Sequence, residues 1–67
     1  MNVVVNGDAQ ALGTESTILD VVRGFGTGAE LGVAVALNGE VVSKSDWGRT
    51  TLNEGDHIEV LRAIGGG

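Results

Sequence analysis

The sequence has 67 residues, of which 42% are hydrophobic, and nine acidic against four basic side chains give it a formal net charge of −5. This length holds one small domain, which buries only about 60% of the surface that its unfolded chain exposes. The acidic balance argues against nucleic acid as a ligand and favours a basic protein partner. Without cysteine, the chain has no disulfide, no thiolate ligand for zinc and no sulfur nucleophile.

The N-terminus lacks the basic stretch and apolar run of a secretory signal, because Asn6-Gly7 interrupts the first apolar residues. The longest apolar run, from Val33 to Leu37, is far shorter than the roughly 20 residues that cross a bilayer. We therefore expect a soluble, cytoplasmic protein with no membrane partner.

The first elements are predicted to be a hairpin and a helix. Val3 to Val5 is β-branched, and Asn6-Gly7 is a strong turn signal that leads into a second arm from Ala9 to Leu12. An amphipathic helix of about two to three turns should follow, with Thr14 or Ser16 as its N-cap. Its apolar positions, at helical spacing, are Ile18, Leu19, Val22 and Phe25.

Glycines from Gly24 to Gly28 are predicted to end this helix, since Gly adopts the left-handed backbone found at helix ends. A G-x-G pattern also occurs in nucleotide-binding loops. Such a loop follows a strand and opens a helix, whereas this one closes a helix, so we reject the nucleotide-site interpretation.

The second half is predicted to be mostly strands. Val33 to Leu37 alternates bulky residues with alanines, and the turn at Asn38-Gly39 returns the chain through Val41-Val42. A single helical turn at Ser45 to Trp47 comes next. Trp47 should cover one end of the core, with its indole N–H bonded to a partner or to water. A turn at residues 53–56 then precedes a last strand, residues 57–62.

This order of elements predicts an α+β fold with a mixed sheet of about four to five strands and one main helix packed on one face. The β-grasp, or ubiquitin-like, architecture fits it. The first and last strands would then pair in parallel at the centre of the sheet. The predicted division is a body of residues 1–63 and a flexible tail of residues 64–67.

Three polar groups invite a catalytic or metal-binding interpretation. His57 stands beside Asp56 and Glu59, but one histidine offers too few ligands for zinc, so we assign it to the surface. Ser43 and Ser45 have no nucleophile motif and are expected to be loop residues. We predict that the chain is not an enzyme and has neither a catalytic residue nor a resident cofactor or metal.

The sequence closes on Gly65-Gly66-Gly67. The ordinary explanation is a frayed end. The alternative is that the terminal carboxylate is the reacting group. Glycine has no Cβ, so such a tail could thread a narrow channel, and residues 64–67 would reach about 13 Å when extended.

The stretches "VAVALNGEVVSKSDW" and "LNEGDHIEVLRAIGGG" resemble the ThiS family, the small sulfur carriers of thiamine thiazole biosynthesis. The resemblance covers nearly the whole chain. Its specific parts are Ala36-Leu37-Asn38, the spacing of Val42 and Trp47, Gly55-Asp56, and Gly66-Gly67. The third glycine, Gly65, is a mild departure from the family's Gly-Gly end.

The resemblance implies that an E1-like adenylyltransferase uses ATP and Mg²⁺ to adenylate the carboxylate of Gly67. Sulfur derived from cysteine, for example through a cysteine desulfurase system, then converts it to a thiocarboxylate, and thiazole synthase takes the sulfur. Ile64, Gly65 and Gly66 would thread the partner active sites. Alternatives are a carrier for molybdopterin or another sulfur-containing product, a protein modifier, or a plain binding module.

The body would present a surface that these partners recognise. If Val33, Val35 and Leu37 face the helix, then Ala34 and Ala36 lie on the opposite face, and Leu61 joins them in a small apolar docking patch. Leu61 as an isolated surface residue is an equally good explanation. Acidic side chains would steer the carrier toward basic partners, in a manner that salt screens; they are Glu54, Asp56 and Glu59.

Overall fold

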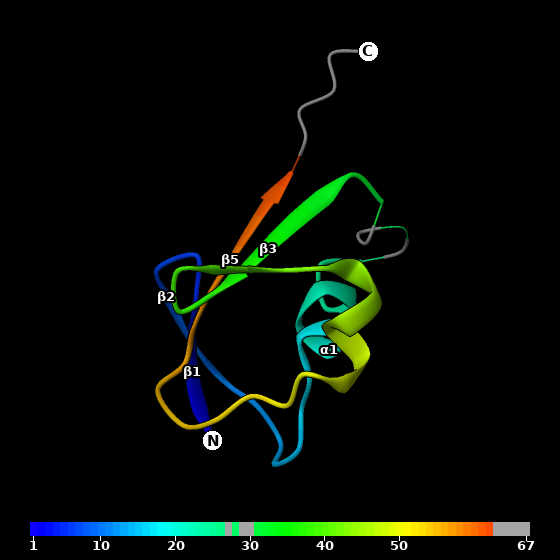
Figure 1. Ribbon diagram of the computed structural model, residues 1–67. Helices are drawn as coiled ribbons and strands as arrows, with labels where there is room; N and C mark the ends of the chain where they lie inside the picture. Colours follow the sequence, from blue (N-terminus) through cyan, green and yellow to red (C-terminus); the bar gives the residue numbers. More distant parts are fainter. Residues whose placement is uncertain (27, 29–30, 63–67) are drawn as a thin grey trace.

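The structure, a computed structural model, describes residues 1–26, 28 and 31–62. Figure 1 shows a sheet with helical segments on one side. In chain order the elements are β1 (Asn2–Val5), β2 (Asp8–Ala11), α1 (Ile18–Arg23), β3 (Val33–Leu37), β4 (Glu40–Val42), the 3-10 helix η1 (Lys44–Arg49) and β5 (His57–Arg62).

Two Asn-Gly turns build the two hairpins. The backbone φ is +50° at Asn6 and +85° at Gly7, and +49° at Asn38 and +87° at Gly39. Positive φ at both central positions is the turn geometry whose twist matches that of the flanking strands. Both predicted hairpins are confirmed, although β2 begins one residue earlier and ends one residue earlier than predicted.

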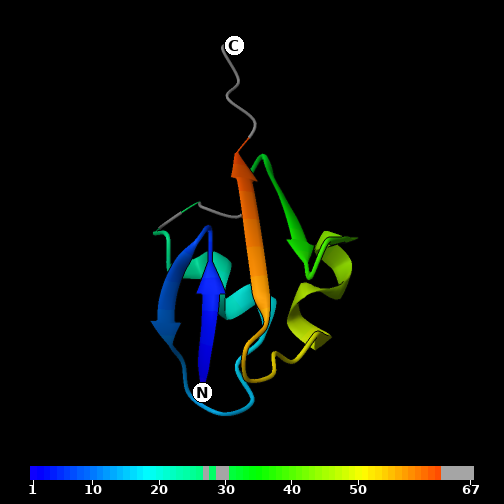
Figure 2. The ribbon, with the colours of Figure 1, turned by 90° about the vertical axis from the view of Figure 1, so that its left-hand side faces the viewer.

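The sheet has the order β2-β1-β5-β3-β4. The first strand, β1, pairs in parallel with β5 (Val4↔His57, Val5↔Ile58), and β3 pairs antiparallel with β5. Figure 2 looks onto the sheet and shows β5 as its middle strand, running in the same direction as β1. The predicted mixed sheet with a central parallel pair is confirmed, and this is the β-grasp arrangement.

One face of the sheet is covered by α1 and η1, and the other face is open (Figures 1 and 2). The core lies between the sheet and these helices, and every buried side chain of the described residues is hydrophobic. Its members are Val3, Val5, Ile18, Val21, Val22, Val35, Trp47, Leu52 and Ile58. With few aromatics in the sequence, β-branched residues make most of this core.

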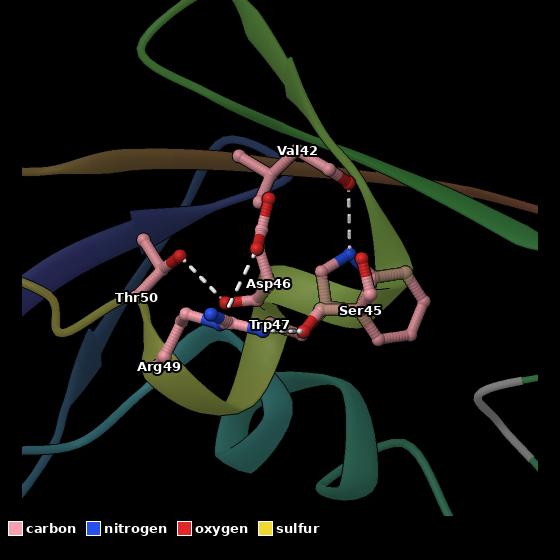
Figure 3. A network of polar contacts seen from close by, with 6 residues as sticks. All are labelled: Val42, Ser45, Asp46, Trp47, Arg49 and Thr50. Atoms are coloured by element: carbon pink, nitrogen blue, oxygen red, sulfur yellow. Dashed lines mark hydrogen bonds and ion pairs between the residues drawn. The ribbon is translucent and has the colours of Figure 1, made fainter.

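Trp47 is 1% exposed, and its indole Nε1 donates to the carbonyl of Val42 at 2.9 Å, as predicted. The helical segment that holds it is longer than the single turn predicted from Ser45 to Trp47. Figure 3 shows its polar contacts: Asp46 Oδ1 forms an ion pair with Arg49 Nε at 3.3 Å, and the Thr50 hydroxyl donates to the Asp46 carbonyl at 2.7 Å. These contacts stabilise the turn that places the indole over the core.

The prediction of Thr14 or Ser16 as the helix N-cap is wrong, because Thr17 occupies that position. The Thr17 hydroxyl accepts from the backbone N–H of Asp20 at 3.4 Å, and the Asp20 carboxylate accepts from the Thr17 N–H at 2.9 Å. This reciprocal capping box satisfies two backbone donors at once. The Ser16 hydroxyl instead donates to the Gly13 carbonyl.

The helix is also shorter than predicted, and Phe25 is not on its buried face. The helix ends at Arg23, and Phe25 lies beyond it with 43% of its surface exposed. Gly24 follows the last helical residue, and its N–H bonds back to the carbonyls of Asp20 and Val21. Although Val22 and Phe25 are spaced as on a helix face, Phe25 therefore lies outside the helix.

Candidate functional site

The site predicted from the sequence begins where β5 ends. Arg62 is the last residue of this strand, and the predicted reacting residue, Gly67, lies outside the described residues, as do Ile64, Gly65 and Gly66. The proposed body boundary at residue 63 falls there too. What the structure places is the strand that leads to these residues and the surface beside it.

Alternation along β3 and β5 divides their side chains between the two faces of the sheet. Val35 pairs with Val60 and Leu37 with Ile58, on the covered face, where Val35 and Ile58 are buried. Cross-strand partners share a face, so the pairs between them in sequence lie on the open face. The predicted sorting of the bulky residues toward the helix is confirmed.

Ala34 pairs with Leu61 on the open face, and Ala36 pairs with Glu59. Leu61 is 61% exposed, Ala34 is exposed and Ala36 is half-buried. The structure thus brings Ala34 and Leu61 together, as predicted, and places Ala36 two residues further along the same face. We call Ala34, Ala36 and Leu61 the open-face patch.

A shallow groove of about 410 Å³ lies at the end of this patch nearest to the C-terminus of β5. It is lined by Gly32, Val33, Ala34, Leu61 and Arg62. The sequence interpretation missed Val41, which pairs with Ala36 and is 81% exposed. No signal in the sequence separates Val41 from Val42, which are the same residue type; only the pairing of β3 with β4 shows which of them lies on the open face.

The two hairpin asparagines hold the backbone of β5 through their side chains. Asn38 Oδ1 accepts from the N–H of His57 at 2.9 Å, at the beginning of the strand. Asn6 Oδ1 accepts from the N–H of Val60 at 2.8 Å, and Asn6 Nδ2 donates to the Val60 carbonyl at 3.4 Å. Both contacts join residues distant in sequence, and the sequence analysis did not find them.

The three acidic residues that were predicted to steer partners differ in their surroundings. Glu54 Oε1 accepts from the N–H of Asn2 at 2.9 Å, and the half-buried Asp56 accepts from Asn38 Nδ2 at 3.0 Å and the N–H of Asn53 at 2.7 Å. Glu59 is exposed on the open face. Two of the three carboxylates therefore hold loops, and the steering role stays a prediction.

His57, Ser43 and Ser45 are all exposed. Ser43 precedes η1 without a side-chain capping bond, and the Ser45 carbonyl accepts from Arg49 Nη2 at 3.4 Å. Within residues 1–26, 28 and 31–62, no group of three or more metal-ligating side chains is close enough to hold an ion. No helix in that same part of the chain has the length and apolar character to cross a bilayer.

Comparisons with known proteins agree with this architecture. The model of the ThiS family matches residues 2–67. The crystal structure of the thiamine biosynthesis protein ThiS from Geobacter metallireducens is 33% identical, with a TM-score of 0.80 and full coverage of both chains. A solution NMR structure of a thiamine biosynthesis protein from the same organism is 36% identical, with a TM-score of 0.76; the match covers 100% of this chain and 88% of that one.

Two curated relatives are similar over all 67 residues and carry the name thiazole synthase. The one from Paramagnetospirillum magneticum is 33% identical, and the one from Magnetococcus marinus is 37% identical. This chain spans only 20% of the length of each. The family match over nearly the whole chain, together with the full-length structural likeness, shows that the chain belongs to the ThiS family.

Proposed function

We propose that this chain is a sulfur carrier for thiamine thiazole formation, and that the carboxylate of Gly67 is the group that carries the sulfur. The observation that supports this most is the family match, which extends to residue 67 and so includes the closing glycines. The likeness to a thiamine biosynthesis protein over the full length of both chains supports it as well.

The chemistry needs activation by a partner. A carboxylate is a poor acyl donor, because its oxygen is a poor leaving group. In the proposed first step the Gly67 carboxylate attacks ATP in an E1-like adenylyltransferase, with Mg²⁺, to form the acyl adenylate and release pyrophosphate. In the second step the terminal sulfur of a persulfide on a cysteine-derived donor, such as a cysteine desulfurase system, attacks the acyl carbon and expels AMP. A thiol then reduces the resulting acyl disulfide, which leaves the thiocarboxylate and oxidises the thiol and the donor sulfur to a disulfide.

The interior of the described residues fits a carrier that partner enzymes recognise and that has no catalytic role of its own. Its buried side chains are hydrophobic and serve packing. We therefore propose that the chain is not itself an enzyme, and that ATP and Mg²⁺ belong to the partner. Ile64, Gly65 and Gly66 would thread the partner's channel, and glycine suits that role because it has no Cβ.

We further propose that the adenylyltransferase docks on the open-face patch. Gly67, the proposed reacting residue, is five positions beyond Arg62, and an extended chain of five residues spans at most about 17 Å. An active site that receives Gly67 must therefore lie close to the end of β5. The groove formed by Ala34, Leu61 and Arg62 is at that end, and the acidic chain favours a basic partner.

The curated relatives favour the thiazole pathway over a carrier for molybdopterin. Each of these thiazole synthases contains a segment similar to this entire chain. A segment similar to this chain and a synthase thus occur in one polypeptide, which links the two proteins to the same pathway. We propose thiazole synthase as the acceptor partner on this basis.

The test is to incubate the protein with ATP, Mg²⁺, the adenylyltransferase and isotopically labelled sulfur. The expected result is label on Gly67, located by fragmentation of the C-terminal peptide and by a thiocarboxylate-selective reagent. Intact mass alone is insufficient, because exchanging oxygen for sulfur adds almost the same mass as oxidising Met1.

Reactions without ATP, and reactions with a variant extended by one residue beyond Gly67 so that the Gly67 carbonyl is in a peptide bond, are the controls, and neither should give label on Gly67. A wild-type chain that stays unlabelled beside an enzyme that is active on another carrier would overturn the proposal. Conjugates to lysine side chains in the same reaction would instead support the protein-modifier alternative.

A further inference from the structure

The last part of β5 has different neighbours on its two sides. On the β3 side, pairing continues to Val33↔Arg62, the final residue of the strand. On the β1 side, the register ends at Val5↔Ile58, because the chain turns at Asn6-Gly7. Beyond that point, β5 would be held from one side only.

The Asn6 side chain supplies the missing neighbour. The Asn6 backbone N–H donates to the carbonyl of Ile58 at 2.9 Å, and its carboxamide then accepts from and donates to the backbone of Val60, at 2.8 and 3.4 Å. A carboxamide has one carbonyl and one NH₂ group, so it presents the donor and acceptor of a peptide unit. It extends the parallel pairing by one step after the main chain has turned away.

We propose that Asn6 is a positioning residue. Its two side-chain hydrogen bonds to Val60, which we call the Asn6 clamp, set the direction in which the chain leaves the sheet toward Gly67. This inference rests on the proposed function for its effect on catalysis. Two described residues, Leu61 and Arg62, separate the clamp from the tail. Angular freedom at Val60 would spread the positions of a group seven residues away, and so lower its effective concentration at a partner's active site.

The second hairpin provides a matched control. Asn38 has nearly the same backbone φ as Asn6, is also followed by glycine, and also accepts from a β5 backbone N–H, that of His57. It acts at His57, the first residue of β5, three residues further from the tail than Val60. Replacing either asparagine by glycine keeps a residue that tolerates positive φ, removes the carboxamide and adds the same backbone freedom to both turns. In Asn38→Gly the hydrogen bond to Asp56 is lost as well.

The experiment compares the variants Asn6→Gly and Asn38→Gly. In Asn6→Gly we expect amide hydrogen exchange at Val60 to rise about 2- to 12-fold, the range for loss of one typical hydrogen bond. NMR order parameters at Leu61 and Arg62 should fall. In Asn38→Gly the increase should occur at His57, and the order parameters at Leu61 and Arg62 should remain as in the wild type.

The kinetic readout separates positioning from docking. For adenylation of Gly67 by the partner, Asn6→Gly should lower kcat by up to about 12-fold, the upper limit expected for the increase in exchange at Val60. KM should stay within about twofold of the wild-type value, because the docking patch is intact. Asn38→Gly should leave kcat unchanged. Equal losses of kcat in both variants, or an unchanged kcat in Asn6→Gly despite faster exchange at Val60, would overturn the inference.

The Asn6→Asp variant offers a graded test that also guards against a fold that is too unstable to assay. A carboxylate can accept from the Val60 N–H but cannot donate to its carbonyl. Order parameters and kcat should therefore lie between those of wild type and Asn6→Gly. If the wild type receives no sulfur on Gly67, the proposed function fails. The role of Asn6 is tested separately, because unchanged order parameters in both Asn6 variants would refute it whether or not the protein is a carrier.

Discussion

Two faces of one sheet differ in what they contribute, and β5 shows the difference within a single strand. Ile58 points to the covered face and is 1% exposed, whereas Leu61, three residues later, points to the open face and is 61% exposed. Both are aliphatic and similar in size. Hydrophobic character alone therefore does not tell whether a residue stabilises the fold or remains available to a partner; its place in the alternation decides this.

The largest expected effect is on the covered face. Ile58→Ala should lower the free energy of unfolding by about 2–5 kcal/mol, because it removes buried methyl groups and leaves a cavity. For a domain whose total stability is of the order of 3–10 kcal/mol, this can unfold much of the population. Chemical denaturation followed by circular dichroism measures it. Leu61→Ala is the control, with an expected loss below about 1 kcal/mol; equal losses would contradict the division of faces.

On the open face, Leu61→Glu should leave the fold intact and weaken binding to the adenylyltransferase by about tenfold or more. The reason is that, in the proposed docking, the groove beside Leu61 faces the adenylyltransferase. Isothermal titration calorimetry gives the dissociation constant. Val41→Glu adds the same charge to the same face, away from that groove, and should have a smaller effect. Unchanged binding by well-folded Leu61→Glu would eliminate the open-face patch as a docking surface.

The stability of α1, which covers one face of the sheet, depends on its N-cap as well as on its apolar face. Thr17→Ala should cost about 0.5–2 kcal/mol, because the Asp20 N–H loses its side-chain partner at the start of α1. Thermal unfolding reports the loss. Thr17→Ser keeps the hydroxyl and should retain most of the stability. If alanine were as stable as threonine, the capping box would have no energetic role.

The smallest expected effect is a gain. Gly48 lies in η1 outside the left-handed region, and a Cβ there would meet only Leu19 Cδ2, at an ordinary distance of 3.6 Å. Gly48→Ala should therefore raise the free energy of unfolding by about 0.4–1 kcal/mol, mainly by restricting the unfolded chain. Gly39→Ala, at φ +87°, should instead destabilise the protein. A loss in Gly48→Ala would show that η1 and α1 are packed more tightly than this distance implies.

The local signals in the sequence predicted most of the fold. β-Branched runs and the two Asn-Gly pairs identified the hairpins, since positive φ restricts those turns to very few residue types. The N-cap was missed because hydroxyl side chains at Thr14, Ser16 and Thr17 could all cap a helix. The pairing of Thr17 with an acid three residues later, Asp20, was the feature that distinguished them.

The candidate site was less predictable. The alternation in β3 and β5 correctly placed Ala34 and Leu61 on one face, but it could not show the groove beside them, because Gly32 and Arg62 meet there only through strand pairing. The Asn6 clamp was not predictable at all. Asn6 and Val60 are 54 positions apart, and the turn propensity of asparagine already accounted for Asn6.

By itself, the sequence determined the local geometry: which segments are extended, where the chain reverses, and which residues of a strand share a side. These properties depend on near neighbours along the chain, through steric limits on φ and through the two-residue period of a strand. Tertiary structure alone decided that α1 and η1 cover one face and leave the patch open, and that Asn6 holds β5 two residues before the strand ends. Those outcomes depend on contacts between distant segments, which exist only once the sheet has assembled.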